Sequence, residues 1–75
     1  MTDDTLYLIH PYNLRLLKIY YHGDILVMEQ YFPLFAKWYC TFYDSDALKV
    51  KAVLDGIEKS QKLTKEEAFR YILCS

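Results

Sequence analysis

Two histidines and two cysteines are the residues of this chain best suited to metal binding or nucleophilic catalysis. His10 precedes a proline and His22 precedes a glycine, and neither has a cysteine or carboxylate near it at the spacing of metal ligands. A histidine in such a turn position is usually structural. Cys40 and Cys74 lie far apart in the chain, so they form neither a zinc motif nor a disulfide framework. The sequence therefore predicts no metal site and no cofactor.

Other signatures of catalysis do not stand out from the sequence either. The chain has only two glycines, so it has no glycine-rich loop to hold a phosphate. No serine has a base partner at a recognisable spacing. Cys40 lies in an apolar, aromatic segment, where a thiol is expected to be buried and inert, whereas Cys74 is expected to be exposed. We therefore predict no catalytic residue and a protein that is not an enzyme.

The charge balance does not favour nucleic-acid binding. Nine Lys and Arg residues stand against ten Asp and Glu residues, giving a net charge of −1, whereas nucleic-acid-binding proteins usually have a clear basic excess. Three lysines, Lys59, Lys62 and Lys65, do cluster where two predicted helices meet, as in a helix-turn-helix module. The second of these helices opens with Glu66 and Glu67, which DNA would repel. Nucleic-acid binding is therefore the alternative function.

A surplus of apolar and aromatic residues is the strongest functional indication. Of the 75 residues, 53% are hydrophobic and 17% are aromatic, yet a chain this short buries only about 60% of its unfolded surface. The excess favours a surface that binds another protein or a second copy, because aromatic side chains contribute strongly at interfaces. We predict a small adaptor or inhibitor protein that acts by protein–protein interaction, with a homodimer as the form of self-association. The predicted contact residues are Tyr20, Tyr21, Met28, Tyr31 and Phe32.

The longest apolar stretch, residues 25–43, does not predict a membrane span. Its seven aliphatic and phenylalanine residues favour insertion by roughly 3.5 kcal/mol, whereas Glu29 and Lys37 each oppose it by about 2.5–3.5 kcal/mol. At the N-terminus, Asp3 and Asp4 stand where a signal peptide carries basic residues. We therefore expect a cytoplasmic protein with reduced thiols.

The clearest signals of secondary structure lie in the second half of the chain. Thr64 and Glu67 match the capping box that opens a helix, and Asp46 is a suitable N-cap. Apolar residues recur with a helical period after each cap. We predict helices over residues 46–59 and 65–74, joined by a short linker.

The first half of the chain is ambiguous between helix and strand. Leu34, Trp38 and Phe42 recur at four-residue spacing after Pro33, which favours a helix. A leucine-rich composition favours a second helix further upstream, although a tight turn at Gly23 would make a hairpin instead. The predicted helices here cover residues 13–22, 24–32 and 33–43, and the last two are either one kinked helix or two helices separated at the proline.

The expected fold is a single, mainly α domain over residues 1–75, built as a small bundle of four to five short helices. Residues 1–4 are expected to be frayed. Residues 5–10 form a short strand or a chain end along the core, because Pro11 stops any continuation as helix. The alternative is an α+β fold, with an N-terminal hairpin over residues 14–31 packed on three helices.

Overall fold

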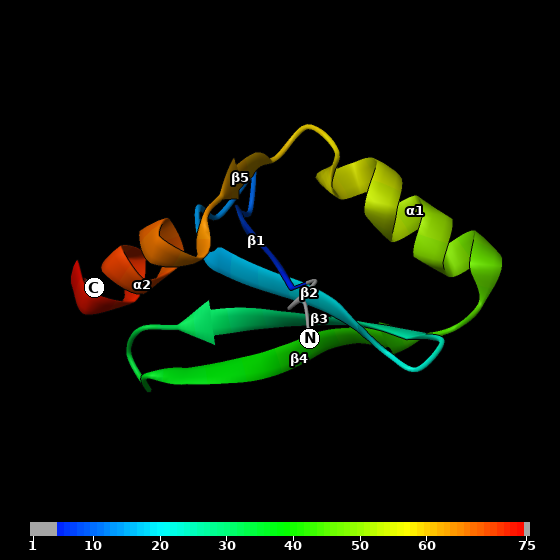
Figure 1. The fold of residues 1–75 in the computed structure, drawn as a ribbon, viewed down its shortest axis with the longest axis horizontal. Helices are drawn as coiled ribbons and strands as arrows, with labels where there is room; N and C mark the ends of the chain where they lie inside the picture. The colour runs from blue at the N-terminus through cyan, green and yellow to red at the C-terminus, as the bar shows by residue number, and fades with distance from the viewer. Residues whose placement is uncertain (1–4, 75) are drawn as a thin grey trace.

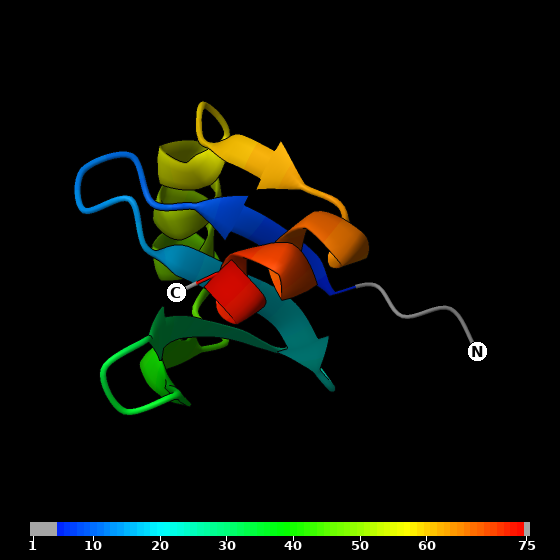
Figure 2. The same ribbon diagram turned by 90° about the vertical axis from the view of Figure 1, so that its left-hand side faces the viewer.

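A five-stranded antiparallel sheet forms the centre of the protein, with strand order β4-β3-β2-β1-β5. The computed structural model describes residues 5–74. The first four strands form a meander, and β5 pairs with β1 at the other edge of the sheet (Figures 1 and 2). The elements are β1 (Leu6–Ile9), β2 (Leu16–His22), β3 (Ile25–Phe32), β4 (Lys37–Asp44), α1 (Ala47–Ile57), β5 (Gln61–Leu63) and α2 (Lys65–Cys74).

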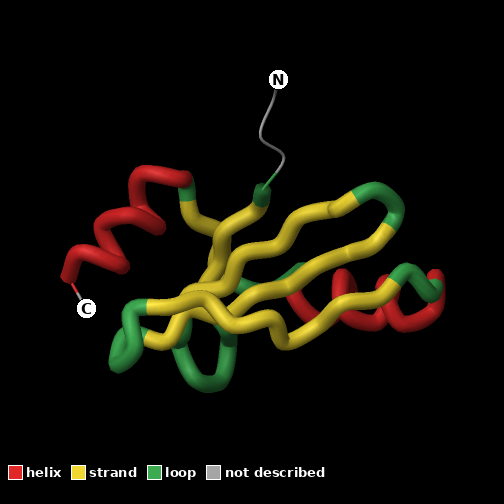
Figure 3. The backbone as a smooth tube through the Cα atoms, turned by 90° about the horizontal axis from the view of Figure 1, so that it is seen from below, coloured by secondary structure: helices red, strands yellow, loops and turns green. Residues whose placement is uncertain are grey.

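The two helices cover opposite faces of the sheet. Val50, Val53 and Ile57 of α1 pack against one apolar cluster of the strands, and Ala68 of α2 belongs to a second cluster. Figure 3 shows the strands running between the two helices. Because successive side chains of a strand point to alternate faces, we call the side under α1 the α1 face and the side under α2 the α2 face.

β2 lies in the middle of the sheet and is buried on both faces. Leu16 is 0% exposed and packs in the α2-face cluster, and Leu17 is 1% exposed and packs in the α1-face cluster. A strand covered on both faces lacks the alternation of apolar and polar residues that marks a half-exposed strand. The helix predicted over residues 13–22 is therefore wrong, because Leu16 and Leu17 lie in a strand and pack into clusters on its two opposite faces.

A two-residue turn joins β2 to β3, where the sequence predicted a break between two helices. His22 pairs with Ile25 across the turn, and Gly23 has a φ of +67°. A glycine with positive φ at the first loop position is the pattern of a type II′ hairpin turn. The helix predicted over residues 24–32 is also wrong, since β3 occupies that segment.

β4 occupies most of the segment that was predicted as a helix over residues 33–43. Trp38 packs in the α2-face cluster, whereas Phe42 packs in the α1-face cluster. Residues four apart share a face in a regular strand as well as in a helix. The register of β4 against β3 shifts at Thr41, however, and this β-bulge sends the two aromatic side chains to opposite faces. The four-residue spacing was therefore not a helical pattern.

The mainly α prediction, a bundle of four to five helices, is therefore wrong. The α+β alternative anticipated a hairpin at β2 and β3, but it kept a helix in place of β4. Of the two options for residues 5–10, the structure has the strand, β1. The fraying expected for residues 1–4 concerns residues outside those that the structure describes.

The two C-terminal helices begin at the caps that the sequence indicates. The Asp46 carboxylate accepts hydrogen bonds from the backbone N–H groups of Leu48, at 2.9 Å, and Lys49, at 3.3 Å. The Thr64 N–H donates to the Glu67 carboxylate at 3.0 Å, and the Glu67 N–H donates to the Thr64 hydroxyl at 3.1 Å. These contacts satisfy backbone donors that a helix leaves unpaired at its start. The linker predicted between the helices contains β5.

Candidate interaction surface

The loop between β3 and β4 presents apolar side chains to solvent. Pro33 ends β3, and Ala36 closes the loop with a φ of +52°. Backbone hydrogen bonds between residues close in sequence turn the loop back on itself, including one of 3.2 Å from the Phe35 N–H to the Phe32 carbonyl. Leu34 is 87% exposed and Phe35 is 59% exposed. The loop therefore holds two large apolar side chains away from the core.

A shallow recess lies beside this loop, lined by Phe32, Phe35, Tyr39 and Thr41 and with a volume of about 370 Å³. We call it the hairpin recess. Tyr39 lies between the two phenylalanines, with ring centres 5.0 Å from Phe32 and 6.3 Å from Phe35. Both ring pairs are close to perpendicular, which is a favourable arrangement of aromatic rings. Three aromatic side chains therefore line the recess, and the contacts of Tyr39 with the two phenylalanine rings hold them in place.

Arg15 places a positive charge beside the hairpin recess. The guanidinium carbon of Arg15 lies 4.5 Å from the centre of the Phe32 ring, a cation–π contact. Gln30 pairs with Leu17 on one side and with Tyr39 on the other, and Leu17 packs in the α1-face cluster, so Tyr39 points to the α1 face. Phe32 lies two residues after Gln30 in β3 and points to the same face. The site can therefore accept an apolar side chain of a partner and place an acidic or carbonyl group beside Arg15.

A second cluster of polar side chains lies on the α2 face of β2, β3 and β4. The Lys18 amine is 4.4 Å from the centre of the Trp38 ring and 3.8 Å from the Glu29 carboxylate. The Tyr20 hydroxyl donates a hydrogen bond of 2.5 Å to the same carboxylate. These groups satisfy one another across three neighbouring strands. We interpret this Lys18–Glu29 cluster as a stabilising network of the sheet.

The hydrogen bond to Glu29 raises the pKa of Tyr20 to about 12, with smaller contributions from burial and from the negative charges of Glu29 and Cys40. Up to about pH 10 the hydroxyl is protonated in both the folded and the unfolded chain. Between pH 10 and about 12 the unfolded chain loses this proton while the folded chain keeps it. The contribution of Tyr20 to stability is therefore present below pH 10 and is lost as the pH rises.

We expect the free energy of unfolding of the wild-type protein to fall more steeply above pH 10 than that of Tyr20→Phe, which has no hydroxyl to titrate. The extra slope cannot exceed about 1.4 kcal/mol per pH unit, because the folded and unfolded chains differ by at most one proton at Tyr20. Urea unfolding followed by circular dichroism measures it. Tyr21→Phe, at the exposed neighbouring position, is the control and should keep the wild-type slope. Equal slopes for the wild type and Tyr20→Phe would contradict the assignment.

The five contact residues predicted from the sequence do not form one surface. Tyr20 and Tyr31 point to the α2 face, whereas Tyr21, Met28 and Phe32 point to the α1 face. Tyr31 is buried in the α2-face cluster, and Met28 packs against the α1-face cluster. Tyr21 is exposed near the turn between β2 and β3. Of the five, only Phe32 lines the hairpin recess.

Sequence reasoning missed Leu34, Phe35 and Tyr39, because the predicted helix placed them on or beside an apolar side facing the core. The signal that could have found them is the proline followed by apolar residues and Lys37. Such a segment also fits an exposed loop between two strands. Read that way, its apolar residues are solvent-facing and need an explanation.

The three lysines of the alternative function lie around β5. The Lys62 amine donates to the carbonyl of Glu58 at 2.9 Å, and the Lys65 amine is 5.9 Å from the centre of the Phe69 ring. Lys59 is exposed just after α1. Since α1 and α2 lie on opposite faces of the sheet with β5 between them, they do not have the geometry of a helix-turn-helix.

The histidine and cysteine positions also have clear local settings. His10 Nδ1 accepts hydrogen bonds from the N–H groups of Tyr12, at 3.1 Å, and Asn13, at 3.3 Å, which shapes the loop between β1 and β2. Cys40 and Cys74 are both exposed, so the expectation that Cys40 is buried is wrong. Within residues 5–74, no three His, Cys, Asp or Glu side chains gather at a metal-binding distance. The described helices are also too short or too polar to cross a bilayer.

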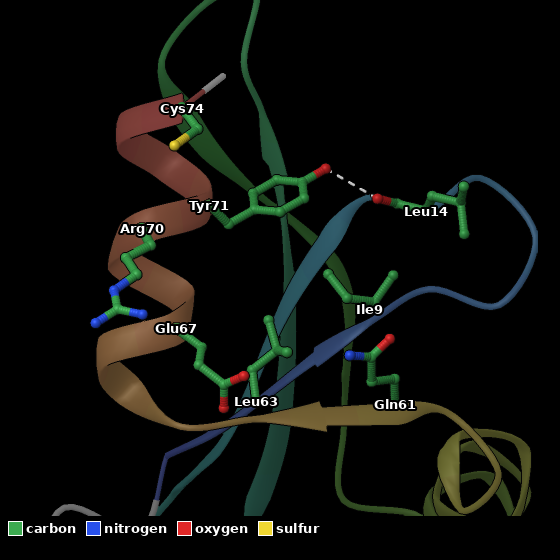
Figure 4. Close-up of a pocket in the computed structure, with 8 residues that line it drawn as sticks. All are labelled: Ile9, Leu14, Gln61, Leu63, Glu67, Arg70, Tyr71 and Cys74. Carbon is green, nitrogen blue, oxygen red and sulfur yellow. Dashed lines mark hydrogen bonds between the residues drawn. The ribbon is translucent and has the colours of Figure 1, made fainter.

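A second groove, of about 500 Å³, lies between α2 and the strands β1 and β5 (Figure 4). Ile9 and Leu63 line it, and the Tyr71 hydroxyl closes one side by donating to the carbonyl of Leu14 at 2.8 Å. Of its charged residues, Glu67 accepts the capping hydrogen bond and Arg70 points away from the groove in Figure 4. The groove therefore has an apolar lining with little charge aimed into it.

The hairpin recess stands out because three properties coincide there. It is concave, its apolar side chains are exposed, and it adjoins β4, whose outer edge pairs with no other strand of residues 5–74. Comparison of the chain with protein family profiles, with curated proteins and with solved structures finds no match.

Proposed function

We propose that the protein acts by binding another protein, or a second copy of itself, through the hairpin recess and the adjoining β4 strand. The observation that carries this proposal is the exposure of Phe35 and of Tyr39, the latter at 44%, in the lining of one concave site, with Leu34 exposed next to Phe35 in the loop. Contiguous exposed apolar groups of this kind mark interaction sites on soluble proteins. The setting we propose is that of an adaptor or inhibitor in the cytoplasm.

The energetics of the loop support this role. Fully burying an exposed leucine or phenylalanine side chain contributes about 1.5–3 kcal/mol. Because Phe35 is already partly buried, about 3–6 kcal/mol is the upper limit for Leu34 and Phe35 together, before the cost of association. A micromolar complex needs about 8 kcal/mol in total. Two anchors from this loop, with a hydrogen-bonding strand edge beside them, therefore supply a substantial part of a functional affinity.

Affinity capture with the purified, tagged protein tests the proposal. We expect Phe35→Asp to lose most of a partner protein that the wild type retains from a host-cell lysate, because a carboxylate in the recess opposes apolar burial. Phe35 lies in a loop, so this variant should keep the wild-type circular dichroism spectrum.

Leu48→Asp is the matched control, since Leu48 is exposed on α1 at the opposite end of β4. An acidic residue is also favourable in the first turn of a helix. The proposal is rejected if Phe35→Asp retains the same proteins, in the same yield, as the wild type and the control.

A further inference from the structure

β4 is a long strand with one uncovered edge. It contains eight residues and lies at the outside of the sheet, with β3 on one side and no strand of residues 5–74 on the other (Figure 1). Such an edge presents unpaired backbone N–H and C=O groups and is a template for pairing with another strand. Tyr43 on this strand is 62% exposed, and Tyr39 is also exposed, on the other face. Both faces of the free edge therefore carry aromatic surface.

The order of side chains along β4 is self-complementary. The strand reads Lys-Trp-Tyr-Cys-Thr-Phe-Tyr-Asp from residue 37 to residue 44. If a second copy runs antiparallel to it about a two-fold axis between residues 40 and 41, each position i faces position 81 − i of the other copy. This arrangement pairs Lys37 with Asp44, Trp38 with Tyr43 and Tyr39 with Phe42, twice each.

The bulge at Thr41 places the aromatic side chains that face each other in this pairing on matching faces. Residues facing each other in a sheet must point to the same face. In a regular strand, two positions separated by an odd number point to opposite faces. Because the bulge adds one residue, Trp38 and Tyr43 both point to the α2 face, and Tyr39 and Phe42 both point to the α1 face. The bulge therefore lets the aromatic pairs on both sides of the axis, Trp38 with Tyr43 and Tyr39 with Phe42, each share a face.

The backbone pattern agrees with the same register. The two-residue turn makes His22 and Ile25 a hydrogen-bonded pair, and such pairs alternate along antiparallel strands. From Ile25 onward, every second residue of β3, including Val27 and Tyr31, therefore directs its backbone groups to β2 and not to β4. Trp38 and Tyr43 pair with Tyr31 and Val27, so their own backbone groups are directed away from β3. In the two-fold arrangement these two residues face each other, as a hydrogen-bonded pair requires.

Charge complementarity supports the ends of the pairing. Lys37 is exposed and forms no ion pair with any other residue in the described part of the chain. Asp44 is held at the far end of β4, because its carboxylate accepts the Asp46 N–H at 2.9 Å and lies 3.4 Å from the Lys49 amine. The hydrogen bond from Asp46 and the Lys49 charge lower the pKa of Asp44, so it is ionised at neutral pH. Opposite charges therefore meet at both ends.

We infer that two copies of this protein form a dimer by antiparallel pairing of their β4 strands, joining two five-stranded sheets into one of ten strands. This inference rests on the proposed function, since it identifies a second copy as one partner of the β4 surface. The axis passes between Cys40 and Thr41, so the exposed Cys40 thiols of the two copies lie next to each other.

Sedimentation equilibrium tests the register through Lys37→Glu, which places a glutamate opposite Asp44 at both ends. We expect the dissociation constant of the dimer to rise about tenfold or more. Lys51→Glu makes the same charge change on the exposed side of α1 and should leave the constant unchanged. A wild-type protein that is a monomer at high micromolar concentration overturns the inference, as does equal weakening by both variants.

Crosslinking with a short bis-maleimide tests the position of the axis. We expect Cys74→Ser to form a covalent dimer as the wild type does, and Cys40→Ser to form none. A dimer that crosslinks only through Cys74 overturns the β4 pairing. If the wild type is a monomer while Phe35→Asp still loses its captured partner, the dimer inference fails and the proposed function stands. If Phe35→Asp captures the same proteins as the wild type, but the dimer and its Cys40 crosslink are present, binding through the hairpin recess is rejected and the β4 dimer stands.

Discussion

Replacing Leu17 with alanine should lower the free energy of unfolding by about 2–5 kcal/mol. Leu17 is 1% exposed in β2, within a cluster that includes Leu8, Ile19 and Leu26 under α1. Strands on both sides and a helix above hold the walls of this cluster in place, so the cavity left by the substitution cannot collapse. A domain of this length has a total stability of about 4–11 kcal/mol. The variant therefore loses a large part of its stability, which urea unfolding followed by circular dichroism measures.

Leu48→Ala is the control for this prediction. Leu48 is 81% exposed in the first turn of α1, so its truncation should change the free energy of unfolding by less than about 0.5 kcal/mol. The location of the core under α1 would be refuted by a loss in Leu17→Ala no larger than that in Leu48→Ala.

Replacing Trp38 with alanine should cost about 2–3 kcal/mol, although Trp38 is only half-buried. Its ring packs against Tyr31 with ring centres 5.3 Å apart, and the Lys18 amine lies over it at 4.4 Å. The substitution removes apolar burial on the α2 face together with the cation–π contact that holds Lys18. Because Trp38 is the only tryptophan, unfolding must be followed by circular dichroism instead of tryptophan fluorescence.

Trp38→Phe and Lys18→Met separate the two contributions. The phenylalanine keeps a ring over Tyr31, so we expect it to lose less than half of what Trp38→Ala loses. Lys18→Met keeps the aliphatic stem and removes the charge, and its effect reports the cation–π contact together with the ion pair to Glu29. Equal losses for Trp38→Phe and Trp38→Ala would show that ring packing does not stabilise this face.

The helices of this fold could be predicted from the sequence, because their signals are local. Asp46, Thr64 and Glu67 bond to backbone groups within three residues of themselves, so a short window contains the whole interaction. The strands could not be predicted in the same way. Leu16 and Leu17 are both buried only because helices from the other end of the chain cover opposite faces of β2. That information lies outside any short window around the strand, since Val50 comes 33 positions after Leu17 and Ala68 comes 52 positions after Leu16.

The interaction surface was predicted in kind but not in position. An excess of aromatic residues indicates a binding surface whatever the fold, and Phe32 does line the hairpin recess. Choosing the remaining residues required knowing which face each one occupies. Tyr31 next to Phe32 is buried on the other side of β3, and the bulge at Thr41 reverses the expected pairing of faces in β4.

The path of α1 from one edge of the sheet to the other has a consequence for the order of folding. β1 to β4 form a meander whose strands pair with neighbours in sequence, so their contacts form after short loops close. β5 contributes only three residues, and it reaches β1 only after α1 has crossed the sheet, pairing Tyr7 with Leu63. We therefore expect a nucleus in the meander and late docking of β5 with α2. Until that docking is complete, β1 is a second open edge, and nascent chains are most prone to associate wrongly at this stage.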